Sequence, residues 1–376
     1  MTNCAPLNST YSSIPTIKSP TQNNLEPNQT VYQPALDIIA LSNPFKPLER
    51  PEAWQQASYA NQHPLVEILA KKGIFNVIST DVHLPKTCVA LSVPTDFKAE
   101  FNQLQLDTFY LRDPSLTLIG KQYEAQNRYS DTLSTDEWLF RPHDPQGILP
   151  FEGWKKQLME WDGLGECPYI NASRIESHSG DIITQAPLSK TEDDFWKMAW
   201  VAQASIVLML TPLYEDGKRK SSHYFPETPE HPFLFGEHFK IKVSLIQELY
   251  RNGFVNKELI MKHAGEERTL SIIHCSDWTD KQAYPIDRLL WLVIYTAGLA
   301  KGKTLIAHCC AGIGRSGTFY ACYLIFLCWK QNNDSIQVDV PRLIKFLRNF
   351  RAGLIQTAVQ YAIIFDFINA LNTYKG

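Results

Sequence analysis

One segment decides the fold: residues 304–319 read TLIAHCCAGIGRSGTF. Its apolar start predicts a buried strand over Thr304–His308, and the run from Gly314 to Lys330 predicts a helix. Gly312 and Gly314 lie in the tight loop between the two, where glycine permits backbone conformations closed to other residues. The amide groups of such a loop point into one concave nest, and the following helix adds unpaired N-terminal donors and the positive end of its dipole. The pattern therefore predicts a site for an oxyanion such as phosphate.

Two reactive side chains stand in this predicted nest. Cys309 lies at its base, where the donors that hold an anion also lower the pKa of a thiol. Arg315 follows six positions later and can grip two phosphate oxygens with its planar guanidinium. Ser316 can donate a hydrogen bond to the sulfur when the sulfur becomes the leaving group. A buried cysteine beside an ordinary glycine turn has the same spacing, but the flanking strand and helix, with His308 and Ser316, favour a nucleophile.

The composition limits the kinds of partner. The chain has 376 residues, 36 of them basic and 39 acidic, and the net charge of -3 argues against gripping nucleic acid or an anionic membrane by bulk charge. The start lacks the features of a secretory signal, and no apolar run approaches the roughly 18 residues that span a bilayer. The cysteines lack paired CxxC spacing, which favours free thiols in a reducing compartment. We therefore predict a monomeric cytoplasmic protein that needs no metal or cofactor.

By composition the chain divides into three regions. Residues 1–34 are rich in Ser, Thr, Asn, Gln and Pro, and we expect disorder because they cannot bury enough apolar surface. Residues 35–94 predict an N-terminal extension or small accessory subdomain, with a helix over 51–72 and a strand over 73–78. Residues 95–376 predict one catalytic domain of the α/β (α+β) class, a mixed sheet flanked by helices.

Within this domain the periodicity predicts individual elements. Strands are expected at 181–185, 206–210, 239–245, 259–262 and 269–274. Helices are expected at 192–202, 287–300 and 341–349, and a capping box of Thr357 and Gln360 predicts the start of the last helix.

The segment 304–319 resembles the signature of the cysteine-dependent, phosphotyrosine-specific protein tyrosine phosphatases. Other landmarks of that family follow in its order over about residues 95–376. The resemblance implies the family's highly twisted mixed sheet and hydrolysis of phosphotyrosine in proteins through a phosphocysteine intermediate. Residues 127–131, NRYSD, resemble its phosphotyrosine-recognition loop, where Tyr129 would stack along the substrate ring and Asp131 would accept hydrogen bonds from the substrate's main chain.

The same resemblance implies the groups that move the proton. Residues 276–280, SDWTD, are similar to the family's mobile acid loop, in which Asp280 protonates the leaving tyrosyl oxygen and then deprotonates the attacking water. Asp277 has the same chemistry but the wrong position relative to Trp278. Residues 351–357, RAGLIQT, resemble the glutamine loop, so that Gln356 would position the water.

Further residues are implied to shape the site. Glu215 would brace the phosphate-binding arginine, Lys220 would approach the acid loop, and Gln360 would assist the water-positioning glutamine. The backbone of the phosphate loop would be supplied by Cys310, Ala311, Gly312, Ile313 and Gly314.

The sequence departs from the family pattern at three places. Thr279 replaces the usual proline of the acid loop, which predicts an active protein with an altered open–closed equilibrium of that loop. Cys310 either fills space as a small residue or captures an oxidised Cys309, although a disulfide between adjacent residues is strained. Residues 132–167 are longer than the family's usual link, contain three tryptophans and predict an extra lobe.

Other functions stay open at this point. A dual-specificity or phosphoinositide phosphatase is disfavoured, because the phosphate loop carries no lysine and Tyr129 implies a deep pocket. A catalytically weak or silent phosphotyrosine-binding module is supported mainly by Thr279. The chain is either a eukaryotic non-receptor enzyme or a bacterial effector delivered into the host cytosol, and its divergent acid loop favours the effector.

Overall fold

The computed structural model describes residues 64–77, 87–141, 169–175, 180–237, 239–251, 253–332 and 336–374. The chain divides into two units, Met1–Pro47 and Leu48–Gly376, and every described residue belongs to the second. The predicted disorder of residues 1–34, the first part of the predicted helix 51–72 and most of the predicted lobe at 132–167 lie outside the described residues.

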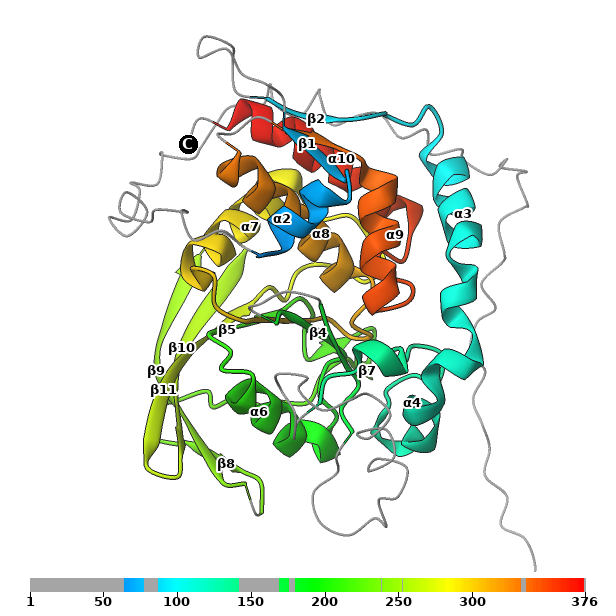
Figure 1. Ribbon diagram of the computed structural model, residues 1–376. Helices are drawn as coiled ribbons and strands as arrows, with labels where there is room; N and C mark the ends of the chain where they lie inside the picture. Colours follow the sequence, from blue (N-terminus) through cyan, green and yellow to red (C-terminus); the bar gives the residue numbers. More distant parts are fainter. Residues whose placement is uncertain are drawn as a thin grey trace, which may run out of the picture. The chain divides into compact units, whose positions relative to one another are not determined.

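A mixed sheet forms the centre of the described structure (Figure 1). Its eight strands lie in the order β3-β4-β12-β5-β11-β10-β9-β8. The middle pairs β4–β12, β12–β5 and β5–β11 are parallel, and the outer pairs are antiparallel. The strand bounds are β3 Ala172–Arg174, β4 Ile182–Thr184, β5 Ile206–Met209, β8 Phe233–Phe235, β9 Ile241–Arg251, β10 Phe254–His263, β11 Glu266–His274 and β12 Leu305–His308.

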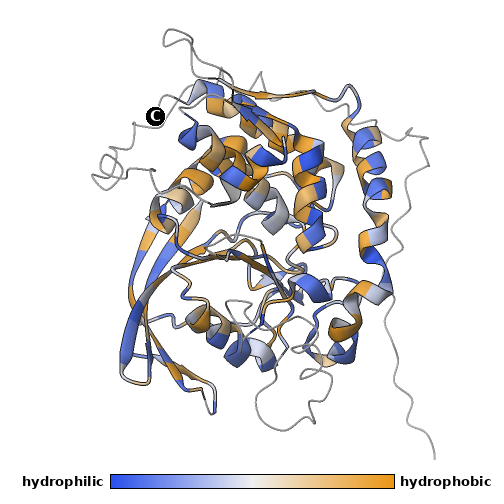
Figure 2. Ribbon diagram, in the orientation of Figure 1, coloured by the Kyte–Doolittle hydropathy of each residue, from blue (hydrophilic) through white to orange (hydrophobic). Residues whose placement is uncertain are grey.

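Helices cover both faces of this sheet (Figure 1). One face carries α7 (Ile286–Ala300), α8 (Arg315–Gln331), α9 (Val340–Phe350) and α10 (Ala358–Thr373), and the other carries α6 (Glu192–Val201). Strand β5 shows why both faces are covered: Ile206 and Leu208 join the core beneath α7 and α8, whereas Val207 and Met209 join the core beneath α6. Such an unbroken apolar run is typical of a central parallel strand, and Figure 2 shows the central strands coloured mainly as hydrophobic.

A second, smaller sheet pairs strands from residues 75–90 with a strand from residues 336–338. Its order is β1-β13-β2, with β1 Phe75–Val77, β13 Ile336–Val338 and β2 Cys88–Ala90. The preceding helix α2 (Pro64–Lys71) ends before Gly73, whose φ is +63°. Leu69, Phe75 and Cys88 belong to the same hydrophobic core as α8 and α10. The described residues of the predicted extension 35–94 therefore share the core of the large sheet.

Most of the remaining elements are helices between β2 and β3. They are α3 (Phe97–Asp107), the short helices η2 (Phe109–Arg112) and η3 (Pro114–Thr117), α4 (Leu118–Gln122), η4 (Glu124–Gln126) and η5 (Asp136–Trp138). A short helix, η6 (Ser189–Thr191), precedes α6, and β6 (Tyr214–Glu215) pairs with β7 (Lys218–Arg219). Among the described helices, none combines the length and the apolar character that crossing a membrane requires.

The predicted elements agree with the structure except in the long ribbon β9–β10–β11. The expected strands 239–245 and 259–262 are too short, because the observed ribbon continues through exposed polar residues that weaken the apolar signal, such as Gln247 and Arg251. The predicted capping box is also only half formed. Thr357 Oγ1 accepts the Gln360 amide at 3.2 Å, but the Gln360 side chain accepts the amide of Gln356 at 3.0 Å instead of that of Thr357.

Candidate active site

The loop from Cys309 to Gly314, the phosphate loop, connects β12 to α8 and presses against the end of β4. Gly312 has a φ of +73°, and a Cβ atom at this position would lie 2.1 Å from the carbonyl oxygen of Thr184. Its amide donates to Cys309 Sγ at 3.3 Å. The carbonyl of Cys310 accepts the amide of Ala186 at 3.0 Å, which ties the loop to the segment after β4. The predicted nest is therefore formed by close backbone packing that glycine alone permits.

A buried arginine that the sequence analysis gave no role holds the outer side of this loop. Arg351 donates to the carbonyl of Gly312 at 2.8 Å and to that of Ala311 at 3.0 Å. It also donates to Asn171 Oδ1 at 2.9 Å, and its other partners are the hydroxyls of Ser134 and Ser173. Burial lowers the pKa of Arg351 to about 10, which leaves it charged at neutral pH. Because the loop carbonyls point outward to this guanidinium, the amides are free to face inward.

The environment of Cys309 favours its thiolate. Burial by itself disfavours the charge, but the guanidinium of Arg315, the hydroxyl and amide of Ser316 and the amide of Gly312 outweigh it and lower the pKa of the Cys309 thiol. Ser316 Oγ is buried and, apart from this interaction with the thiol, has no hydrogen-bond partner among the described residues. The thiolate is therefore stabilised by groups that converge on the base of the loop.

His308, directly before Cys309, is a buried neutral residue. Burial lowers the pKa of His308 to about 3. Nδ1 lies 3.2 Å from the Cys309 carbonyl oxygen, which can only accept, so Nδ1 carries the proton. Nε2 then accepts from the hydroxyl of Tyr224 at 2.7 Å. This pair fixes the backbone of Cys309 without adding charge.

Arg315 is fully buried at the mouth of the phosphate loop. Its Nη1 donates to the carbonyl of Trp278 at 2.7 Å, and its Nη2 lies 3.3 Å from Asp280 Oδ1. Within the described part of the chain, Nε has no hydrogen-bond partner, and Nη2 pairs with the Asp280 carboxylate by charge without forming a hydrogen bond. A buried guanidinium with two unsatisfied donors is suited to bind two oxygens of a phosphate.

The structure brings Asp280 to the phosphate loop. The acid loop, residues 276–280, lies in a closed position in which Asp280 contacts Arg315. Lys220 Nζ lies 3.6 Å from Asp280 Oδ2 and 3.4 Å from Glu215 Oε2. Glu215 Oε1 accepts the backbone amide of Asp280 at 2.9 Å, whereas its other oxygen is 3.8 Å from Arg315 Nη2. Glu215 therefore contacts the acid loop more closely than the arginine that it was predicted to brace.

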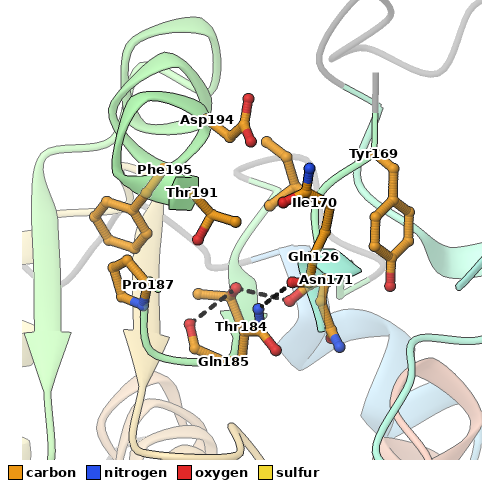
Figure 3. Close-up of a pocket in the computed structure, with 10 residues that line it drawn as sticks. All are labelled: Gln126, Tyr169, Ile170, Asn171, Thr184, Gln185, Pro187, Thr191, Asp194 and Phe195. Carbon is orange, nitrogen blue, oxygen red and sulfur yellow. Dashed lines mark hydrogen bonds between the residues drawn. The ribbon is translucent and has the colours of Figure 1, made fainter. Parts of the chain in front are cut away.

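The loop that carries Tyr129, residues 127–131, is held by hydrogen bonds of Asn127 and Arg128. Asn127 donates to the carbonyl of Gly120 at 2.7 Å and accepts from the hydroxyl of Tyr169 at 2.7 Å. Arg128 donates to the carbonyl of Pro187 at 2.8 Å. Figure 3 shows a small pocket at the back of this loop, where Gln185 donates to the Gln126 carbonyl; no predicted site residue lines it.

Tyr129 itself stands at the rim of the site. Its side chain is 41% exposed, and its hydroxyl lies 3.2 Å from Cys310 Sγ. Burial and the contact with Cys310 raise the pKa of the Tyr129 phenol, so that it stays neutral. Burial also raises the pKa of the Cys310 thiol. Asp131 is exposed and accepts from the hydroxyl of Thr132 at 3.3 Å.

Gln356 and Gln360 close the site from the side of α10. The position of a Cβ atom at Gly314 lies 3.0 Å from Gln356 Oε1 and 3.1 Å from Gln360 Nε2. Both amide groups therefore face the end of the phosphate loop. Gln360 is fully buried, and its Nε2 has no partner within the described ranges. Ile313, the remaining loop residue, accepts the amide of Ile355 at 3.0 Å, which joins the two loops.

A thiolate, an unsatisfied guanidinium and a carboxylate around one nest define a cysteine-based site for phosphoryl chemistry. Residues 125–370 match the model of the family described as protein-tyrosine phosphatase. The chain belongs to this family. A solved structure of PTPN18 in complex with HER2 phosphopeptides has the same fold, with a TM-score of 0.62 and 22% identity over 73% of this chain and 93% of that one.

Similar proteins come from several organisms. Tyrosine-protein phosphatase 3 of Dictyostelium discoideum is 31% identical over 277 residues, which are 69% of this chain and 27% of that protein. Tyrosine-protein phosphatase non-receptor type 7 of Mus musculus is 35% identical over 225 residues, 58% of this chain and 60% of that protein. The match thus spans less than two thirds of either relative.

Proposed function

We propose that this chain hydrolyses phosphotyrosine in proteins through a phosphocysteine intermediate. One observation carries the proposal: the thiolate of Cys309, the unsatisfied donors of Arg315 and the carboxyl of Asp280 converge on one nest of backbone amides. In-line attack by the sulfur forms the S–P bond while the bond from phosphorus to the tyrosyl oxygen breaks. Asp280 gives that oxygen its proton, and Arg315 and the loop amides stabilise the charge on the transferring group.

The second step releases phosphate. Water attacks phosphorus, Asp280 takes a proton from it, and the S–P bond breaks to return the thiolate. Gln356 faces the phosphate loop at Gly314, which supports its role in positioning this water. Ser316, whose hydroxyl has no other partner within the described residues, donates to the leaving sulfur.

Aryl specificity is supported by Tyr129. Its ring lies at the rim, 41% exposed, and its hydroxyl reaches Cys310 of the phosphate loop. A phenyl phosphate has an aromatic ring long enough to place its phosphate in the nest while stacking along Tyr129. The PTPN18 structure is a complex with HER2 phosphopeptides, which is consistent with a phosphotyrosine protein as substrate here.

The compartment is proposed on the same basis. The described cysteines are free thiols, and Cys309 acts only in its reduced form. We therefore place this activity in a cytoplasm. The bacterial-effector origin stays a prediction.

Burst kinetics with p-nitrophenyl phosphate test the mechanism. We expect a burst of nitrophenol equal to the enzyme concentration, a trapped phosphoprotein after acid quench, and neither with Cys309→Ser. A silent binding module would bind a phosphotyrosine peptide without turnover. Full hydrolysis by Cys309→Ser would refute the mechanism. An Asp280→Ala variant should trap the physiological substrates for identification.

A further inference from the structure

A cluster of side chains occupies the side of the acid loop that faces away from Arg315. Asp277 Oδ1 accepts from the hydroxyl of Tyr284 at 2.7 Å and from Cys275 Sγ at 3.5 Å. Its other oxygen forms an ion pair with Arg288. Both oxygens of Asp277 are therefore engaged by donors outside the phosphate loop, which explains why Asp277 does not act as the general acid.

This cluster is connected to the catalytic arginine through one tryptophan. The ring of Tyr284 stacks on that of Trp278, with centroids 5.0 Å apart and planes at 18°. The indole N–H of Trp278 donates to the carbonyl of Gln282 at 2.9 Å. The carbonyl of Trp278 accepts from Arg315 Nη1 at 2.7 Å. Trp278 is thus held by Tyr284 on its ring and by Arg315 on its backbone.

The cluster joins the acid loop to rigid parts of the fold. Arg288 lies in the first turn of α7, and the hydroxyl of Tyr284 also approaches the carbonyl of Gly253 at 3.4 Å, just before β10. Burial raises the pKa of the Tyr284 phenol, so this residue is a neutral hydrogen-bond donor at neutral pH. Thr279, by contrast, is exposed and lacks the ring that restricts the usual proline.

We propose that Asp277, Tyr284 and Arg288 form a latch that holds the acid loop in its closed position and thereby positions Asp280. The latch acts through Trp278. Its side-chain contacts replace part of the backbone restriction that a proline at position 279 would supply. Asp277, Tyr284 and Arg288 are positioning residues, since none of them reaches the phosphate loop. This inference rests on the proposed function, because it concerns proton donation by Asp280.

The test measures how turnover depends on the leaving group. With Asp280 in place, kcat varies little among aryl phosphates whose phenols differ in pKa, because every phenolate is protonated as it leaves. We expect Tyr284→Phe and Asp277→Asn to lower kcat roughly ten- to 150-fold, the range set by one hydrogen bond to a charged group. The loss should be largest for the phenols of highest pKa.

Three controls separate positioning from general damage. The rate of Cys309 alkylation by iodoacetate should stay at the wild-type value, because the phosphate loop is untouched. Asp107→Asn removes a matched exposed ion pair, Asp107 with Lys345 at 2.5 Å on α3, and should leave kcat unchanged for all phenols. The double variant should lose no more than the worse single variant, since both act through one contact. Arg288→Met is a further variant, and we expect it to fold because the Arg288 side chain is 40% exposed.

The outcomes distinguish the two proposals. Wild-type hydrolysis with an unchanged leaving-group dependence in all three latch variants would refute the latch alone. A wild-type protein without burst or turnover would refute the proposed function, and the latch with it. Additive losses in the double variant would also overturn the latch as a single unit.

Discussion

Replacing Gly312 by alanine tests whether the phosphate loop depends on its contact with β4. The φ of +73° costs an alanine about 1–2 kcal/mol. In addition, the new Cβ would lie 2.1 Å from the carbonyl oxygen of Thr184 and 2.9 Å from the amide nitrogen of Gln185. Carbon and oxygen approach only to about 3.3–3.6 Å even in favourable C–H···O contacts. Both blocking atoms belong to the backbone, so no side-chain rotation relieves the overlap.

The loop must therefore shift by roughly 1 Å, and a displacement of that size costs about 10²-fold in rate. The shift would move the Gly312 amide away from Cys309 Sγ, to which it now donates at 3.3 Å. We expect kcat/KM for p-nitrophenyl phosphate to fall at least about 10²-fold, and the thiol pKa of Cys309 to rise.

A second glycine provides the matched control. Gly265, in the turn between β10 and β11, has a φ of +84° and nothing within 4 Å of its Cβ position. Gly265→Ala carries the backbone cost alone, so urea unfolding should report a loss of about 1–2 kcal/mol with kcat/KM within about twofold of wild type. A Gly312→Ala protein with the kcat/KM of the Gly265→Ala control would refute the reasoning.

Three further predictions concern single side chains. Arg351→Lys keeps the charge but loses the planar guanidinium that reaches two loop carbonyls. The free energy of unfolding, measured in urea, should fall by at least about 3 kcal/mol, because each charge-assisted hydrogen bond contributes about 1.5–3 kcal/mol. An unchanged urea midpoint would contradict this. Ser316→Ala removes a group that lowers the pKa of Cys309, so the thiolate forms at higher pH. The acid limb of the pH profile of iodoacetate alkylation should therefore move to higher pH. A profile identical to that of the wild type would show that the hydroxyl does not lower this pKa. Thr279→Pro should shift the acid-loop equilibrium by about two- to fivefold, the effect of about 0.4–1 kcal/mol of backbone restriction, and an identical kcat and pH profile would exclude it.

Much of the site could be predicted because its signals are local. The strand, glycine turn and helix around Cys309 occupy sixteen consecutive residues, 304–319, and each element has its own propensity. The observed bounds, β12 at Leu305–His308 and α8 at Arg315–Gln331, follow the predicted ones to within one residue. The structure brings Asp280, Gln356 and Tyr129 to the phosphate loop, and their chemical roles stay proposals.

The contacts of Arg351 could not be predicted in the same way. Its partners Asn171 and Ser173 precede it by about 180 residues in the chain, and its partner Ser134 precedes it by 217. No periodicity relates positions so distant, and an arginine in a polar loop is ordinarily exposed. Its only sequence signal was its place as the first residue of the segment 351–357, which resembles the glutamine loop.

By itself, then, the sequence determined the oxyanion nest and placed a cysteine at its base, because a strand, two glycines and a helix start specify backbone donors over a few adjacent residues. Only the tertiary structure decided which groups surround that nest. It turned the loop carbonyls outward onto Arg351, assigned Glu215 to the Asp280 amide, and engaged Asp277 with Tyr284 and Arg288. The physical reason is that these contacts join residues far apart in the chain, whose distances are set by packing rather than by spacing.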